Sequence, residues 1–121
     1  MAKVLITDDS RFMRDNLRSI LQAAGHEIVG EAPNGKEAVS MYDRLHPDLV
    51  TMDITMPIMN GLDALKEIIA HDSRASVIMV TAIGKPEKVL EALNAGAKSY
   101  ITKPFEKDKV LEAINELFAL A

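Results

Sequence analysis

Acidic, hydroxyl and basic side chains follow four apolar runs of this sequence, each close to the point where the run ends. In chain order these side chains are Asp8, Asp9, Asp53, Thr81 and Lys103. If the runs are neighbouring strands, three carboxylates meet at one place, where like charges repel and raise each other's pKa. A fold that keeps such a group together needs a cation. Oxygen ligands without histidine or cysteine suit a hard divalent ion, Mg²⁺ or Ca²⁺.

Phosphoryl chemistry fits this set of side chains. Mg²⁺ commonly takes one or two carboxylates and leaves coordination positions for water and phosphate oxygens. An aspartate can also act as a nucleophile and form an aspartyl phosphate. A lysine would then neutralise charge on the transferred group, and a threonine hydroxyl could donate a hydrogen bond to one of its oxygens. The acids are not regularly spaced within one twelve-residue loop, so an EF-hand is excluded.

Each of these residues also has an ordinary structural interpretation. Asp8 and Asp9 could simply begin the turn into a helix, because aspartate is a common turn and cap residue. Thr81 could be a normal strand residue, and Lys103 could be a solvated surface lysine. Asp53 stands in an apolar stretch and has no evident capping role. Their shared position at the ends of apolar runs, more than any one residue, favours a functional site.

Short apolar runs alternate with amphipathic segments along the whole chain. The runs are residues 4–6, 28–29, 49–52, 77–80 and 100–101. Consecutive apolar positions are typical of strands buried on both faces, and the intervening segments have helical periodicity. Five βα units predict an α/β fold, a doubly wound five-stranded parallel sheet with five helices. The order 2-1-3-4-5 is common for such sheets, although this sequence does not determine strand order.

Composition limits the class of protein. The chain has 121 residues, 48% of them hydrophobic, which predicts a single domain over residues 1–121. With 14 basic against 18 acidic residues the net charge is −4, which argues against nucleic acid as a partner. There is no cysteine, so disulfides, thiolate zinc sites and cysteine catalysis are excluded. No long apolar run or signal peptide is present, so we expect a cytoplasmic protein without membrane attachment.

Four motifs in this order resemble those of response-regulator receiver domains. They are Asp8-Asp9, the segment DITMPIMNG at residues 53–61, Thr81-Ala82 and Lys103-Pro104-Phe105. The resemblance runs from residue 3 to the final helix, and within the family it is closest to the stand-alone chemotaxis receivers. It implies the flavodoxin-like fold with strand order 2-1-3-4-5.

The resemblance also implies a role for each site residue. Asp53 accepts a phosphoryl group from the phosphohistidine of a histidine kinase. Asp9 and Asp53 bind Mg²⁺ through their side chains, Asp8 helps directly or through water, and Thr55 offers its backbone carbonyl. Lys103 contacts the phosphoryl group. The family usually has a cis peptide bond before the proline that matches Pro104.

A switch is implied rather than an enzyme with a separate substrate. The chain would catalyse only its own phosphorylation and dephosphorylation. Thr81 is the switch hydroxyl, and Tyr100 matches the aromatic residue that turns inward once Thr81 moves toward the phosphate. Thr55 and Ile83 stand at two positions that influence phosphoryl lifetime in the family. Neither is an acid or an amide, which leaves the lifetime open and allows for a separate phosphatase.

The implied partner surface is the segment 85–109. It carries six lysines against four acidic residues, a balance that suits an acidic or amphipathic peptide but is also found on ordinary solvated surfaces. The resemblance implies a histidine kinase as phosphodonor and an output protein such as a flagellar motor switch component. We expect the chain itself to be a monomer.

Several other functions are weighed against the phosphoacceptor switch. A phosphorelay intermediate or another single-domain adaptor would use the same site. A Mg²⁺-dependent phosphohydrolase with an aspartate nucleophile would need an acid two residues after Asp53, where Thr55 stands. A flavin or nucleotide binder would need a glycine-rich loop after the first strand, which is absent. An unphosphorylated interaction module is disfavoured by the intact acids, threonine and lysine.

Overall fold

Parallel strands alternate with helices throughout the computed structural model, which describes residues 1–82 and 84–119. The strands are β1 (Lys3–Thr7), β2 (Glu27–Ala32), β3 (Leu49–Asp53), β4 (Val77–Ala82) and β5 (Ser99–Lys103). The helices are α1 (Arg11–Ala23), α2 (Gly35–Leu45), α3 (Gly61–His71), α4 (Pro86–Asn94) and α5 (Lys107–Ala119). The strands form one sheet in the order β2-β1-β3-β4-β5, which confirms the predicted fold class and strand order.

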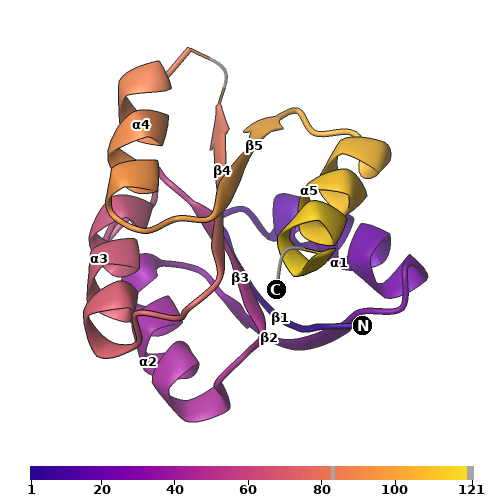
Figure 1. The fold of residues 1–121 in the computed structure, drawn as a ribbon, viewed down its shortest axis with the longest axis horizontal. Helices are drawn as coiled ribbons and strands as arrows, with labels where there is room; N and C mark the ends of the chain where they lie inside the picture. Colours follow the sequence, from indigo (N-terminus) through magenta and orange to yellow (C-terminus); the bar gives the residue numbers. More distant parts are fainter. Residues whose placement is uncertain (83, 120–121) are drawn as a thin grey trace.

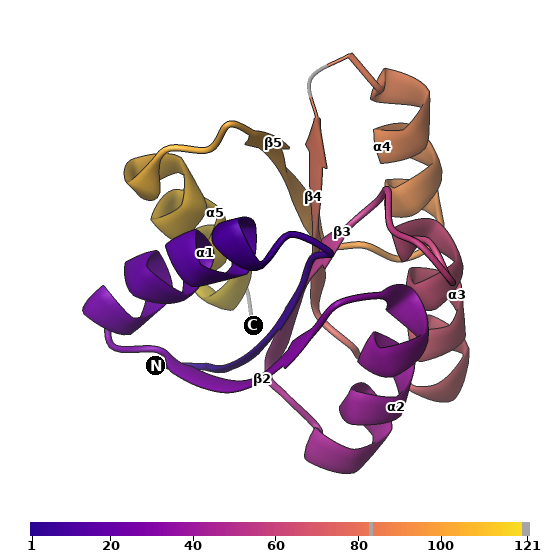
Figure 2. The same cartoon turned by 180° about the vertical axis from the view of Figure 1, so that it is seen from behind.

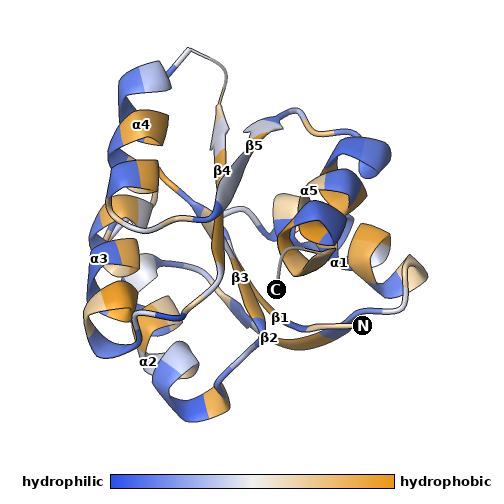
Figure 3. Cartoon of the chain, in the orientation of Figure 1, coloured by the Kyte–Doolittle hydropathy of each residue, from blue (hydrophilic) through white to orange (hydrophobic). Residues whose placement is uncertain are grey.

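Helices cover both faces of the sheet. Helices α1 and α5 lie on one face, and α2, α3 and α4 lie on the other (Figures 1 and 2). Each face has its own apolar core, since alternate residues of one strand point to opposite sides. Leu5 and Val50 join the core under α2 and α3, whereas Val4 and Leu49 join the core under α1 and α5. Apolar positions accordingly gather on the strands and on the inner sides of the helices (Figure 3).

Burial along the sheet explains which runs were predicted most completely. The three central strands β1, β3 and β4 are buried almost throughout, so they have consecutive apolar residues. The edge strands are more exposed: β2 is mostly half-buried, and β5 alternates between buried and exposed positions. An edge strand tolerates polar residues, and β2 therefore extends beyond its apolar pair to include Glu27 and Glu31.

Side-chain caps fix the beginning of the helices that border the functional edge. Ser10, Asn34 and Asn60 each accept a hydrogen bond from the backbone N–H three residues later, which satisfies one free donor of the first turn. Helix α4 instead has Pro86 in its first turn, where a missing N–H costs nothing. Two of these caps begin α1 and α3, the helices that follow β1 and β3, whose ends carry the candidate acids.

The loop from β3 to α3 turns back onto the end of β3. The backbone N–H of Gly61 donates to the carbonyl of Ile54 at 2.8 Å. Ile58 takes a left-handed conformation with φ 69° and is exposed.

Two further features concern the rest of the chain. The Lys103–Pro104 peptide bond, directly after β5, is cis, as the resemblance to the family implies. Among the described residues, no helix has the length and apolar character needed to cross a bilayer.

Candidate functional site

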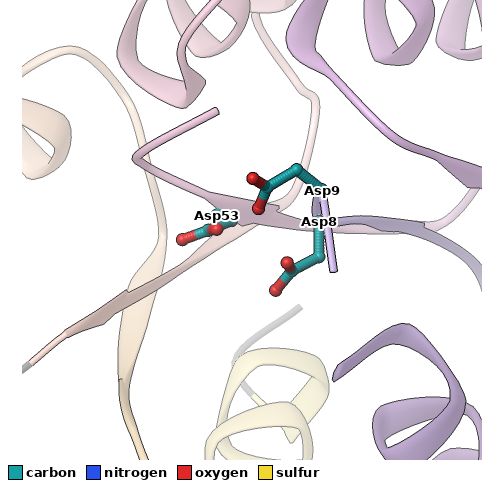
Figure 4. A group of neighbouring side chains, drawn as sticks. All are labelled: Asp8, Asp9 and Asp53. Carbon is teal, nitrogen blue, oxygen red and sulfur yellow. The ribbon is translucent and has the colours of Figure 1, made fainter. Parts of the chain in front are cut away.

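Three carboxylates meet at one edge of the sheet. Strands β1 and β3 are paired in parallel with Thr7 opposite Met52, so the residues that follow, Asp8 and Asp53, end at the same level. Carboxylate oxygens of Asp8, Asp9 and Asp53 all lie within 4.8 Å of one another. Figure 4 shows the three side chains gathered at the ends of these two strands. Asp8 and Asp53 are buried, whereas Asp9 is exposed.

Lys103 completes the group from the end of β5. Its Nζ lies 2.7 Å from Oδ2 of Asp8 and 3.3 Å from Oδ2 of Asp53. The lysine side chain is 21% exposed, so these ion pairs are poorly screened by solvent. One ammonium group therefore bridges the two buried carboxylates that the sheet brings together.

Burial and charge shift the protonation of this group. Burial and the neighbouring charges of Asp8 and Asp9 raise the pKa of Asp53 from 3.8 to about 6, against the opposing effect of Lys103. Burial alone would lower the pKa of Lys103, but its hydrogen bonds and charge interactions with Asp8 and Asp53 outweigh burial and raise it. At neutral pH the site therefore combines an ionised but destabilised Asp53 with a fully charged lysine.

The donors suit a divalent cation with a preference for oxygen. The cluster offers only carboxylate oxygens, and one ammonium cannot neutralise three carboxylates. The residual negative charge and the raised pKa of Asp53 both indicate that a further cation would stabilise the cluster. Such a donor set fits Mg²⁺.

Thr55, whose backbone carbonyl the resemblance assigns to the metal, lies two residues past the end of β3 and is exposed. Its hydroxyl accepts a hydrogen bond from Nζ of Lys85 at 3.1 Å. This contact joins the loop after β3 to the loop after β4 across the functional edge. In the sequence Lys85 stands out only as part of a lysine-rich segment, because no motif indicates a partner thirty residues earlier in the chain.

The two residues to which the resemblance assigns switching, Thr81 and Tyr100, lie on the paired strands β4 and β5. Thr81 is buried near the end of β4, and its hydroxyl donates to the carbonyl of Ala82 at 3.3 Å. Tyr100 on β5 is 47% exposed. Both line a hollow of about 370 Å³ between α4 and β5, together with Pro86 and Leu90. Ile83, assigned to phosphoryl lifetime, lies outside the described residues.

Mg²⁺ is expected to stabilise the fold. At about 10 mM Mg²⁺ and a dissociation constant of about 1 mM, binding to the folded state alone adds about 1.4 kcal/mol to the free energy of unfolding. Thermal unfolding at pH 7.5 with Mg²⁺, and with K⁺ at matched ionic strength, measures this effect. The rise should require Mg²⁺ and should be lost in Asp9→Asn. An equal rise with K⁺ would show only general screening of the acids.

Comparisons with known proteins agree with this geometry. The model of the response regulator receiver domain matches residues 4–115. The chemotaxis protein CheY of Thermotoga maritima is 53% identical over 115 residues, covering 95% of this chain and 96% of that protein. CheY of Bacillus subtilis is 53% identical over 114 residues, covering 94% and 95%.

A solved structure shares the fold closely. It is the CheX–CheY–BeF₃–Mg²⁺ complex from Borrelia burgdorferi, which superposes with a TM-score of 0.93 at 42% identity and covers 96% of this chain and 88% of that one. The family match, the relatives and the superposition all extend over nearly the whole chain. The chain therefore belongs to the response regulator receiver domain family, the signalling switches of two-component systems.

Proposed function

We propose that this chain is a chemotaxis response regulator in which Asp53 accepts a phosphoryl group from a histidine kinase in a Mg²⁺-dependent reaction. The observation that carries the proposal is the meeting of Asp8, Asp9, Asp53 and Lys103 at the carboxyl ends of β1, β3 and β5. We infer a single receiver domain over residues 1–121 that works as a monomer in the cytoplasm.

Phosphoryl transfer needs no separate base at this site. A carboxylate oxygen of Asp53 forms a bond to phosphorus, the bond between phosphorus and the donor imidazole nitrogen breaks, and the imidazole keeps that electron pair. Asp53 is already ionised at neutral pH, because its pKa is about 6. Lys103, 3.3 Å from Asp53, is placed to neutralise charge on the incoming group.

Asp8, Asp9, Asp53 and the backbone carbonyl of Thr55 would hold the Mg²⁺. The ion would neutralise the carboxylates and the charge on the transferred phosphoryl group. Asp9, as the exposed member of the cluster, is accessible to an arriving ion. The chain would catalyse its own phosphorylation and dephosphorylation, and the phosphoryl group would stay on the protein between them.

Phosphorylation would then change the positions of the Thr81 and Tyr100 side chains. The Thr81 hydroxyl makes only a 3.3 Å hydrogen bond to the neighbouring carbonyl, whereas a phosphoryl oxygen on Asp53 is a charged and stronger acceptor. Asp53 is paired with Val80 across β3 and β4, so Thr81 is at the adjacent position. A shift of Thr81 would free space in the shared hollow, which Tyr100 can fill by turning inward.

The output surface we propose is the segment 85–109, which comprises α4, β5 and the beginning of α5. Leu90 and Tyr100 are exposed on it among lysines, so an amphipathic segment with acidic residues would fit.

A flagellar motor switch component is the partner we propose for this surface, since the curated relatives include several chemotaxis proteins. The CheX complex of the Borrelia relative supports a phosphatase as a further partner. A phosphorelay intermediate is the alternative.

Labelling of Asp53 tests the proposal. Acetyl phosphate with Mg²⁺, or a chemotaxis kinase, should add one phosphoryl group to the wild-type chain, and peptide mass spectrometry should place it on Asp53. Asp53→Asn should remove the label, whereas Asp43→Asn, at an exposed aspartate on α2, should keep it. A label on another residue, or labelling without Mg²⁺ at the same rate, would contradict the proposal. The phosphorylated form should bind the motor component more tightly than Asp53→Asn does.

A further inference from the structure

A chain of charged groups joins β2 to the backbone of the metal-binding acids. Glu31 on β2 accepts from Nε of Arg14 at 3.1 Å through Oε1 and from Nε of Arg18 at 2.8 Å through Oε2. Nη2 of Arg18 also donates to the same Oε2. Burial alone would raise the pKa of Glu31, but the hydrogen bonds and charges of Arg18 and Arg14 outweigh burial and lower it. Glu31 is therefore a firmly ionised anchor for both guanidinium groups.

Arg14 connects the Glu31 carboxylate to the backbone of the candidate site. While its Nε contacts Glu31, its Nη1 donates to the backbone carbonyl of Asp8 at 2.6 Å. The Arg14 side chain is only 15% exposed, so solvent competes weakly for both contacts. A guanidinium presents its donors in a rigid planar fork, so Nε and Nη1 of one arginine hold two acceptors in a fixed relative geometry, whereas the three donors of a lysine rotate about a single nitrogen.

The backbone of Asp8 is thereby tied to β2 at both ends. Its N–H donates directly to the carbonyl of Ala32, and its carbonyl is held through Arg14 to Glu31, the residue before Ala32. That carbonyl belongs to the peptide unit that leads into Asp9. Fixing the plane of this peptide sets the direction of the backbone at Asp9, just after the end of β1.

Asp9 depends most on this support. The carboxylate of Asp8 is held independently, by the backbone N–H of Ser10 at 2.9 Å and by Lys103 at 2.7 Å. Asp9 is exposed, so the backbone that carries it largely determines where its carboxylate lies. Groups outside the ligand shell that orient ligands in this way commonly control metal affinity.

We propose that Arg14, oriented by Glu31, is a positioning residue that presets the Asp8–Asp9 peptide for Mg²⁺ binding. This inference rests on the proposed Mg²⁺-dependent phosphorylation of Asp53. Arg14 contacts neither the ion nor the transferred group, and it acts through the direction of Asp9.

The sign of the effect separates positioning from charge. Removal of a positive charge near a cation site should tighten Mg²⁺ binding by electrostatics alone. Arg14→Gln is instead expected to weaken Mg²⁺ binding by about tenfold, a usual loss for an outer-shell partner. Arg14→Lys keeps the charge but loses the fork, so it should weaken binding as well. Isothermal titration of Mg²⁺ into the unphosphorylated protein measures both.

Two arginines of the same helix serve as matched controls. Arg11 lies at the beginning of α1 with its side chain 85% exposed, and Arg18 shares Glu31 with Arg14. The contact to the Asp8 carbonyl comes from Arg14. Arg11→Gln and Arg18→Gln should bind Mg²⁺ as tightly as the wild type or more tightly. Glu31→Gln should also weaken binding, but loss of its negative charge acts in the same direction. Arg14→Lys, which keeps the charge and loses the fork, therefore provides the second test if Arg14→Gln folds poorly.

Phosphorylation by acetyl phosphate gives an independent readout. In Arg14→Gln the Mg²⁺ concentration for half-maximal rate should rise about tenfold, while the rate at saturating Mg²⁺ stays close to that of the wild type. Loss of stability alone would not produce this split, and urea unfolding in EDTA measures stability separately. If wild type binds Mg²⁺ and is labelled, but Arg14→Gln binds Mg²⁺ as tightly, only the positioning role is overturned. If wild type neither binds Mg²⁺ nor is labelled, the proposed function fails with it.

Discussion

Gly61→Ala is expected to lower the free energy of unfolding by about 4 kcal/mol, in the range of severe packing defects. A Cβ at this position would lie 1.9 Å from the carbonyl oxygen of Asp53 and 3.0 Å from Cα of Ile54. These are backbone atoms, so no side chain can rotate away to make room. The beginning of α3 would have to separate from the end of β3 and lose the hydrogen bond from Gly61 to Ile54.

Urea unfolding in EDTA measures the loss, and Gly25→Ala is the matched control. Gly25 has φ +91° but no atom near its Cβ direction within 4 Å, so alanine there costs only backbone strain, about 1 kcal/mol. Equal losses at the two positions would show that the close approach at Gly61 is relieved cheaply. If Gly61→Ala remains folded, its labelling rate should fall, because the displaced backbone carries Asp53.

Asp53→Asn is expected to stabilise the metal-free protein by about 3 kcal/mol at pH 8, and the gain should disappear at acidic pH. In the folded state the pKa of Asp53 is raised to about 6 from the ordinary 3.8. Below both values the carboxyl is protonated in the folded and unfolded chain, so the group has no effect. As pH rises through about 6, ionisation in the buried site destabilises the folded wild type, and the asparagine variant avoids this cost.

Urea unfolding between pH 4 and pH 8 in EDTA tests this sign. The difference in free energy of unfolding between Asp53→Asn and wild type should grow with pH and level off above about pH 7. Asp43→Asn should show no comparable growth, since Asp43 is exposed. A stabilisation that is the same at pH 4 and pH 8 would mean that the gain comes from packing and that Asp53 is not strained by its charge. Mg²⁺ should narrow the difference by stabilising only the wild type.

The central strands could be predicted because burial on both faces leaves a direct mark on the sequence. Residues 49–52 and 77–80 are apolar at consecutive positions, as β3 and β4 require. Strand order leaves no such mark, because side chains of β1 look the same whether β3 or β4 lies beside it. The order came from the resemblance to receiver domains, and the observed pairing of β1 with β3 confirms it.

The residues of the polar site could be predicted from the sequence, but the backbone contacts that hold them in place could not. Asp8, Asp53 and Lys103 each follow an apolar run, and parallel strands bring such positions to one edge. The contact of Arg14 with the Asp8 carbonyl and the approach of Gly61 to Asp53 involve backbone atoms, which carry no residue type. Any sequence with arginine or glycine at these positions allows the contacts, but only the folded backbone shows that they form.

Lys103 and Asp8 are separated by 95 positions in the chain, yet they are joined by one of the shortest contacts of the site. The last strand to be synthesised therefore supplies the ammonium group that the first strand's acid needs. A nascent chain that has not yet emerged beyond β5 has all three acids but lacks the lysine. On the proposed mechanism, such a chain would lack the group that neutralises charge on the incoming phosphoryl group.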